Sequence, residues 1–183
     1  QRFANQVFIN RNAMDVHAMI REASDALLSI GNIDVVLNRF ADVVKGATGT
    51  DRVMILVSHN DGYVQAYPYA NGQSKYIPGP DSLVRLLERS KQPVSTVAVR
   101  RARRDNVFVE AARYLADCEA AVAMGVKSGG NLQGIMMVGP RLSGRVYSAR
   151  EEDALQLLCD QLAVSFQNAR LYTRWGARQK DKN

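Results

Sequence analysis

Apolar residues recur at helical spacing near both ends of the chain. The first stripe repeats every seven residues and consists of Ile9, Val16, Ala23 and Ile30, with Met19 and Ala26 at intervening positions. A second stripe follows Asn32, a residue type that commonly caps helices. A third follows Ser148, whose hydroxyl can form a capping box with Glu151, three residues later. These patterns predict helices over residues 13–30, 33–45 and 148–172.

The middle of the chain has the patterns of strands and short helices. The apolar run 53–57 predicts a buried strand, and Asn60-Asp61-Gly62 predicts a turn into the next strand. Ser128-Gly129-Gly130-Asn131 predicts a second hairpin. The predicted strands cover residues 53–57, 63–68, 93–99, 120–126 and 132–138; helices cover 83–87 and 106–116, and a loop covers 70–80. The expected fold class is α+β, with a central antiparallel sheet, helices on its faces and long N- and C-terminal helices.

Length and composition fit one globular domain with a short extension. The chain has 183 residues, 46% of them hydrophobic and 23% charged, which excludes a wholly disordered chain. Its net charge of +6 is concentrated in Arg100–Arg104 and in the tail 174–183, so no basic face for nucleic acid is expected. No apolar stretch approaches the roughly 18 residues of a membrane span. We therefore expect a cytoplasmic domain without nucleic-acid or membrane contacts.

The first residue is Gln1 rather than Met, so we expect a piece of a longer protein, which could still carry a membrane anchor. Two cysteines, Cys118 and Cys159, have no Cys or His partner at short spacing, so they predict no metal site. Cys159 lies on the apolar stripe of the last predicted helix, where it would pack as a small hydrophobic residue. Cys118 has no evident catalytic base beside it.

Three segments together resemble a known family. They are Asp51 to Val57 after an amphipathic helix, Leu132 to Gly139, and the run from Tyr147-Ser148 to Asn168-Ala169-Arg170-Leu171-Tyr172. This combination resembles the GAF domain, a PAS-related sensory module, and in particular the GAF domains of bacterial sensor histidine kinases and related signalling proteins. The resemblance implies a linker or signalling helix over 1–31, the GAF-like domain over 32–173, and a basic tail or start of a linker to an output domain over 174–183.

This resemblance implies a regulatory role, in which the domain would bind a small molecule or relay a signal through its flanking helices. Two alternatives stay open, a ligand-free dimerisation spacer and an enzyme of the free methionine sulfoxide reductase type. Cys118 is followed by Glu119 rather than His, so the bilin-attachment motif of the family is missing. Asn106 is followed by Val107, so the Asn-Lys motif of the cyclic-nucleotide binders is missing too. We expect no catalysis, no bilin or haem, and no metal.

Two groups of residues are candidates for binding such a ligand. The first is the arginine run with Arg100, Arg103 and Arg104, because guanidinium groups suit carboxylates and phosphates. The second group, of aromatic residues, consists of Tyr67, Tyr69, Tyr76 and Phe108. The simpler interpretations are a solvated loop for the arginines and ordinary core packing for the aromatic side chains.

The terminal helices predict a parallel homodimer. Its expected seam consists of Ile9, Val16, Met19, Ala23 and Ile30 in the first helix, and Leu155, Leu162 and Ala169 in the last. An amphipathic helix must bury its apolar stripe, and a second copy of the chain would provide a surface for it. The alternative is that both helices pack on the sheet of their own monomer.

Overall fold

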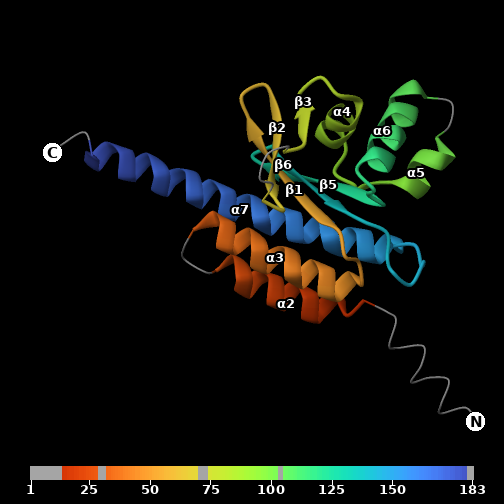
Figure 1. The fold of residues 1–183 in the computed structure, drawn as a ribbon, viewed down its shortest axis with the longest axis horizontal. Coiled ribbons are helices and arrows are strands. Elements are labelled where there is room, and N and C mark those ends of the chain that lie inside the picture. Colours follow the sequence, from red (N-terminus) through yellow and green to blue (C-terminus); the bar gives the residue numbers. More distant parts are fainter. Residues whose placement is uncertain (1–13, 29–31, 70–73, 103–104, 181–183) are drawn as a thin grey trace, which may run out of the picture.

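The computed structural model describes residues 14–28, 32–69, 74–102 and 105–180 (Figure 1). The helices in this part of the chain are α2 (Val16–Leu27), α3 (Ile33–Thr48), α4 (Ser82–Arg89), α5 (Thr96–Arg101), α6 (Asn106–Asp117) and α7 (Ala149–Lys180). The strands are β1 (Val53–His59), β2 (Gly62–Tyr67), β3 (Tyr76–Pro78), β4 (Val94–Ser95), β5 (Val122–Ser128) and β6 (Asn131–Val138). The predicted α+β class, with a central antiparallel sheet and helices on its faces, is confirmed.

The six strands form one antiparallel sheet in the order β3-β2-β1-β6-β5-β4. Both predicted hairpins are present. Asn60 adopts a φ of 51° in the turn between β1 and β2, and Gly129 and Gly130 adopt 57° and 82° between β5 and β6. These are left-handed conformations that asparagine and glycine accept readily, which explains why the chain reverses at these points.

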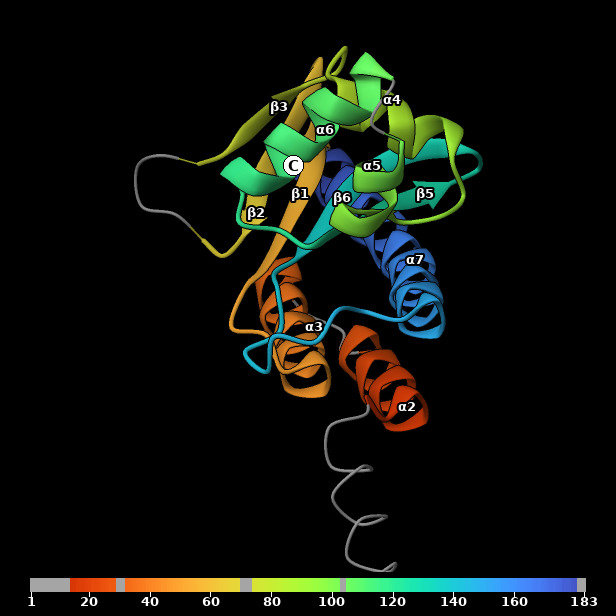
Figure 2. The ribbon, with the colours of Figure 1, turned by 90° about the vertical axis from the view of Figure 1, so that its right-hand side faces the viewer.

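The sheet separates two apolar cores. Helices α2, α3 and α7 cover one face, and α4, α5 and α6 cover the other (Figures 1 and 2). Alternate residues of β6 enter the two cores, with Met136 on the α7 side and Ile135 and Met137 on the α4 side. This period of two explains why the second half of β6, from Ile135 to Val138, is apolar at every position.

Two predicted elements differ from the structure. Residues 93–99 were expected to be a strand, but only Val94 and Ser95 pair with β5. The hydroxyl of Ser95 then accepts a hydrogen bond from the backbone of Ala98 (3.2 Å) and begins helix α5. The cap therefore prevails over the β-branched composition of this segment. The predicted loop 70–80 contains a short edge strand, β3, which pairs with β2.

The last helix begins as predicted and is longer than predicted. The backbone N–H of Ser148 donates to Oε2 of Glu151 (2.8 Å), which completes the capping box. From there α7 runs for 32 residues, about 48 Å at 1.5 Å per residue. Its first half lies on the sheet and beside α2, and its second half extends beyond the rest of the domain (Figure 1).

The predicted dimer seam is wrong for four of its residues. Met19, Ala23, Leu155 and Leu162 are all at most 1% exposed and belong to the core between α2, α3, α7 and the sheet of the same chain. They cannot face a second copy, because α2 packs against α3 and α7 of its own monomer, and α7 packs against β5, β6 and α2. Val16 is half-buried against the same core. Ile9 and Ile30, and the side chain of Ala169, lie outside the described residues.

Candidate functional site

Two pockets in the described part of the chain are lined by polar side chains. The first, which we call the sheet-end pocket, has a volume of about 230 Å³. It lies where β1, β6 and the turn from α6 to β5 come together. Its lining consists of Lys45, Asp51, Arg52, Val53, Met54, Pro68, Cys118, Glu119, Ala120, Met137 and Gly139.

Three of the four charged side chains that line the sheet-end pocket interact with one another, and the fourth, Lys45, bonds to Tyr67. Arg52 forms an ion pair with Glu119, and its Nε lies 3.9 Å from Oδ1 of Asp51. Lys45 donates from Nζ to the hydroxyl oxygen of Tyr67 (2.8 Å) and lies 5.2 Å from the centroid of that ring. The pocket therefore offers balanced charges rather than an excess of one sign, which suits a small polar ligand.

Cys118 is the one nucleophilic side chain in the lining of the sheet-end pocket. It is half-buried and hydrogen-bonds with Tyr114. Burial raises the pKa of the Cys118 thiol, and this outweighs the opposing effects of Lys75 and of the Tyr114 hydroxyl. A raised thiol pKa reduces the fraction of thiolate, which is the nucleophilic form.

The cysteines allow a direct test of their predicted roles. Replacing Cys159 by serine is expected to lower the free energy of unfolding by about 1–3 kcal/mol, because the serine hydroxyl would be buried in an apolar core built around a thiol. Cys118→Ser is expected to change it by less than about 1 kcal/mol, since the half-buried hydroxyl keeps Tyr114 as a partner. Urea denaturation of both variants checks this. Equal losses at the two sites would contradict the assignment of Cys159 to the core.

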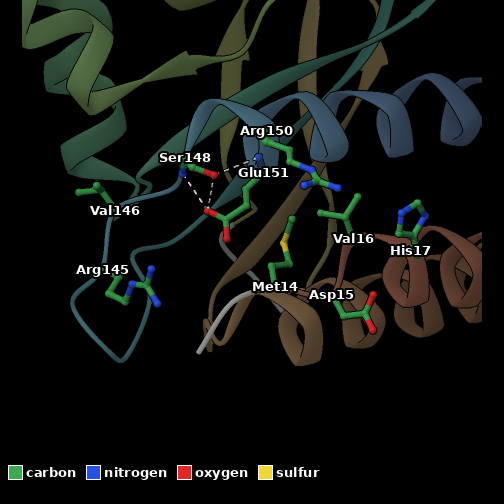
Figure 3. Close-up of a pocket in the computed structure, with 9 residues that line it drawn as sticks. All are labelled: Met14, Asp15, Val16, His17, Arg145, Val146, Ser148, Arg150 and Glu151. Atoms are coloured by element: carbon green, nitrogen blue, oxygen red, sulfur yellow. Dashed lines mark hydrogen bonds between the residues drawn. The ribbon is translucent and has the colours of Figure 1, made fainter. Parts of the chain in front are cut away.

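The second pocket, the helix-junction pocket, has a volume of about 400 Å³ and lies between the first turns of α2 and α7 (Figure 3). Its lining consists of Met14, Asp15, Val16, His17, Arg145, Val146, Ser148, Arg150 and Glu151. The carboxylate of Asp15 caps α2 by accepting from the backbone of Ala18 (3.0 Å). Glu151 holds the first turn of α7, as described above. Both acidic groups therefore fix a helix start.

A buried arginine supports this junction from the side of the sheet. Arg141 is 6% exposed, and its Nη2 lies 2.7 Å from Oε1 of Glu151. Its guanidinium also lies 4.7 Å from the ring centroid of Tyr147, whose hydroxyl donates to the carbonyl of Gly139 (2.9 Å). These contacts attach the start of α7 to the end of β6.

The structure does not bring the predicted tyrosines together in one pocket. Tyr67 is 7% exposed and packs in the α7-side core, while the side chain of Tyr69 is 82% exposed. Tyr76, on the edge strand, donates from its hydroxyl to Asp61 (2.8 Å). Phe108 packs against the α4-side core. Core packing, the simpler interpretation, therefore describes Tyr67 and Phe108.

The arginine run is only partly described. Arg100 belongs to helix α5, where its side chain is not described, and Arg103 and Arg104 lie outside the described residues. Their role in ligand binding stays a prediction. Sequence patterns missed the polar groups of the sheet-end pocket, Lys45 and Arg52, because their partners Tyr67 and Glu119 are distant in the sequence and no motif connects them.

Within the described residues, no group of three or more His, Cys, Asp or Glu side chains is placed to hold a metal ion. None of the helices in that part of the chain combines the length and the apolar character needed to cross a membrane.

The family is established by comparison with known proteins. Residues 32–166 match the family model of the GAF domain. The chain therefore belongs to the GAF domain family, as its sequence segments and its sheet order had indicated. Comparison with curated protein sequences found no match.

Solved structures share the fold at low sequence identity. The GAF domain of a two-component sensor histidine kinase from Bacillus halodurans is 24% identical, with a TM-score of 0.57, and the match covers 78% of this chain and 98% of that one. The GAF domain of a phosphoenolpyruvate-protein phosphotransferase from Coxiella burnetii is 16% identical, with a TM-score of 0.65, and the match covers 89% of this chain and 99% of that one. The structure of fRMsr of Staphylococcus aureus, in complex with its substrate, is 8% identical, with a TM-score of 0.60, and the match covers 84% of this chain and 97% of that one. At these identities the likeness shows the fold alone.

Proposed function

We propose that the chain is the regulatory GAF domain of a bacterial signalling protein, a sensor histidine kinase, and that it passes a signal to an output domain through α7. The observation that carries this proposal is the continuity of α7. One helix of 32 residues contributes Leu155 and Leu162 to the domain core and then extends beyond the domain (Figure 1). A shift of its first half would therefore move its second half as well.

The start of α7 is also where the two terminal helices meet. Both α2 and α7 begin at the helix-junction pocket, and farther along Ser24 of α2 donates from its hydroxyl to Gln161 of α7 (2.9 Å). A ligand or a neighbouring domain that favours one arrangement of this helix pair shifts its population, and α7 carries the change outward. This mechanism requires no catalytic residue, and the domain acts in the cytoplasm.

The ligand we propose is small and anionic, and it contacts the arginine run. Citrate and inorganic phosphate are suitable probes, because they present the carboxylate and phosphate groups that guanidinium groups bind. Calorimetric titration is expected to show binding that the double variant Arg103→Ala, Arg104→Ala weakens at least tenfold, since each charged hydrogen bond contributes about 1.5–3 kcal/mol. Arg113→Ala, on α6, serves as the control. Equal affinity in both variants would contradict the arginine site.

The relay itself is tested by hydrogen exchange in α7 with and without the bound probe. The proposal expects slower exchange between Leu155 and Phe166 on binding. Binding without any change in α7 would favour a domain that stores a ligand and relays nothing. The absence of binding, together with a stable dimer, would favour the ligand-free spacer.

A thiol enzyme is the second candidate, because Cys118 lines a pocket. The raised pKa of its thiol argues against this role. Methionine sulfoxide reduction by the wild type that disappears in Cys118→Ser would establish the enzyme and overturn our proposal.

We still propose that the chain forms a dimer, but through a different surface from the seam predicted from the sequence. Leu157 and Val164 lie seven residues apart on α7 and are 45% and 56% exposed, so they form an outward stripe that can meet its twin in a second copy. We expect Val164→Glu to shift the dimer towards monomer by placing two like charges at this seam. Light scattering over a concentration series measures this, with Val109→Glu, at an exposed position of α6, as the control. A wild type that is monomeric at every concentration would rule out this seam.

A further inference from the structure

A structural change on one face of the sheet can reach the other face either through the strands or around the edge of the sheet. Helix α4 packs in the core on one face, and α7 packs in the core on the other. The proposed function requires a change on the α4 side to reach α7. At the β5 edge of the sheet, polar side chains connect both helices to the same stretch of strand.

That place is the second half of β5. Strand β4 pairs only with Val122 and Ala123, so within the described residues β5 forms the sheet edge from Met124 onward. At Gly125 the missing side chain leaves room for Leu132, since a Cβ there would lie 2.8 Å from its Cδ1. The same Cβ would lie 3.3 Å from Cε of Lys127 and in ordinary contact, at 3.6 Å, with the carbonyl oxygen of Leu87 in α4, so both groups are close to this edge.

Lys127 connects this edge to α4. Its Nζ donates to the carbonyl oxygens of Glu88 (3.1 Å) and Ser90 (2.5 Å), in the last turn and at the C-cap of α4. Carbonyl groups at a helix C-terminus lack partners within the helix and carry its partial negative charge, so an ammonium group satisfies both needs. Burial lowers the pKa of Lys127, while the carboxylates of Asp160 and Glu88 oppose this effect.

The same edge is connected to α7 by Gln156. This side chain donates from Nε2 to the carbonyl oxygen of Gly125 (2.9 Å) and to Oδ1 of Asp160 (3.2 Å). The Lys127 ammonium and the Asp160 carboxylate attract each other at a longer range than an ion pair. The hydrogen bonds therefore connect the last turn of α4 to β5 through Lys127, and β5 to α7 through Gly125 and Gln156.

We infer that Lys127 is a positioning residue that couples α4 to α7 around the edge of the sheet. When the last turn of α4 moves or frays, Lys127 loses its two carbonyl partners, and the edge of β5 near Gly125 is held less firmly. The hydrogen bond from Gln156 to the Gly125 carbonyl, which attaches α7 to this edge, then weakens. This inference rests on the proposed function, because it gives the route by which a change on the α4 face reaches the output helix.

A mild change in α4 tests this coupling without any ligand. Asp81 caps α4 by accepting from the backbone of Leu83 (2.8 Å), so Asp81→Ala loosens this helix without making a cavity. Loss of a cap costs about 1 kcal/mol, which corresponds to about fivefold faster exchange in α4. We expect exchange of α7 amides around Asp160 to rise about two- to threefold in Asp81→Ala, while α3 amides stay unchanged.

The decisive measurement repeats this comparison without the bridge. In Lys127→Met, α7 exchange is expected to respond no longer to Asp81→Ala, and Lys127→Arg is expected to restore the response. Lys91→Met, which removes a nearby exposed charge, should leave the response intact. If Lys127→Met folds poorly, Gln156→Met breaks the same series from the α7 side, because it removes the hydrogen bond to the Gly125 carbonyl.

If Lys127 only adds stability, Lys127→Met will raise exchange in all elements and leave the α7 response to Asp81→Ala intact. This result would overturn the inference. So would the absence of any α7 response in the wild-type background. Because the experiment uses no ligand and no output domain, the coupling can fail while the regulatory function holds. Equally, the coupling can be present in a domain that binds no ligand.

Discussion

Replacing Gly134 by alanine is expected to lower the free energy of unfolding by about 3 kcal/mol. A Cβ at this position would lie 2.5 Å from the carbonyl oxygen of Leu56 and 3.0 Å from Cε2 of Phe166. Gly134 pairs with Val57 on one side and Val126 on the other, so its backbone cannot move away. The first contact is with backbone, and the second displaces a core residue of α7. Urea denaturation measures the loss.

The matched control is Gly46→Ala in helix α3. No atom lies within 4 Å of a Cβ built there, so alanine is expected to stabilise the domain by up to about 1 kcal/mol through its higher helix propensity. The two glycine replacements thus have opposite expected signs. A Gly134→Ala protein as stable as the wild type would show that α7 and β1 do not pack against β6 as described. Near-UV circular dichroism of the same protein would report whether the core had rearranged.

The sequence predicted the elements that depend on local signals. The capping box of Ser148 and Glu151, the turn at Asn60 and the link at Gly129 and Gly130 act within a few residues, and each is present in the structure. The apolar run of β1 was recognisable because its residues enter the cores on both faces of the sheet. The order of the predicted elements indicated a central antiparallel sheet with helices on its faces, but the order of the six strands within the sheet was not predicted.

Long-range relationships were harder to predict. Met19 and Leu155 have the spacing of a dimer seam, but an apolar stripe does not specify what covers it. Here α2 is covered by the domain's own α3 and α7, and α7 by its own sheet and α2. Only Pro68 separates Tyr67 from the exposed Tyr69, and nothing in the local sequence says that Tyr67 lies in the core. Arg52 and Glu119 meet across 67 positions, so their ion pair has no local signature.

Arg141 carries the other large expected effect. Arg141→Met retains much of the side-chain volume but leaves the Glu151 carboxylate without its buried partner. Removing one member of a buried ion pair typically costs about 3–5 kcal/mol, and we expect about 3 kcal/mol here because Glu151 keeps its hydrogen bonds to Ser148. Thermal and urea denaturation at pH 7 measure this loss, and Arg145→Met, in the same loop but exposed, provides the control.

The pH dependence of this loss separates the ion pair from simple packing. Burial works to raise the pKa of Glu151, but the hydrogen bonds to Ser148 and the charge of Arg141 outweigh it and hold that pKa below its ordinary value. A carboxyl group with a lowered pKa in the folded state stabilises the protein above its unfolded-state pKa, and this contribution is lost as the pH falls through the folded-state value. The difference in stability between wild type and Arg141→Met is therefore expected to shrink on acidification below the ordinary pKa of a glutamate. If the difference stays constant from neutral to acidic pH, Arg141 stabilises the start of α7 through its contact with Tyr147 alone, and its charge contributes nothing.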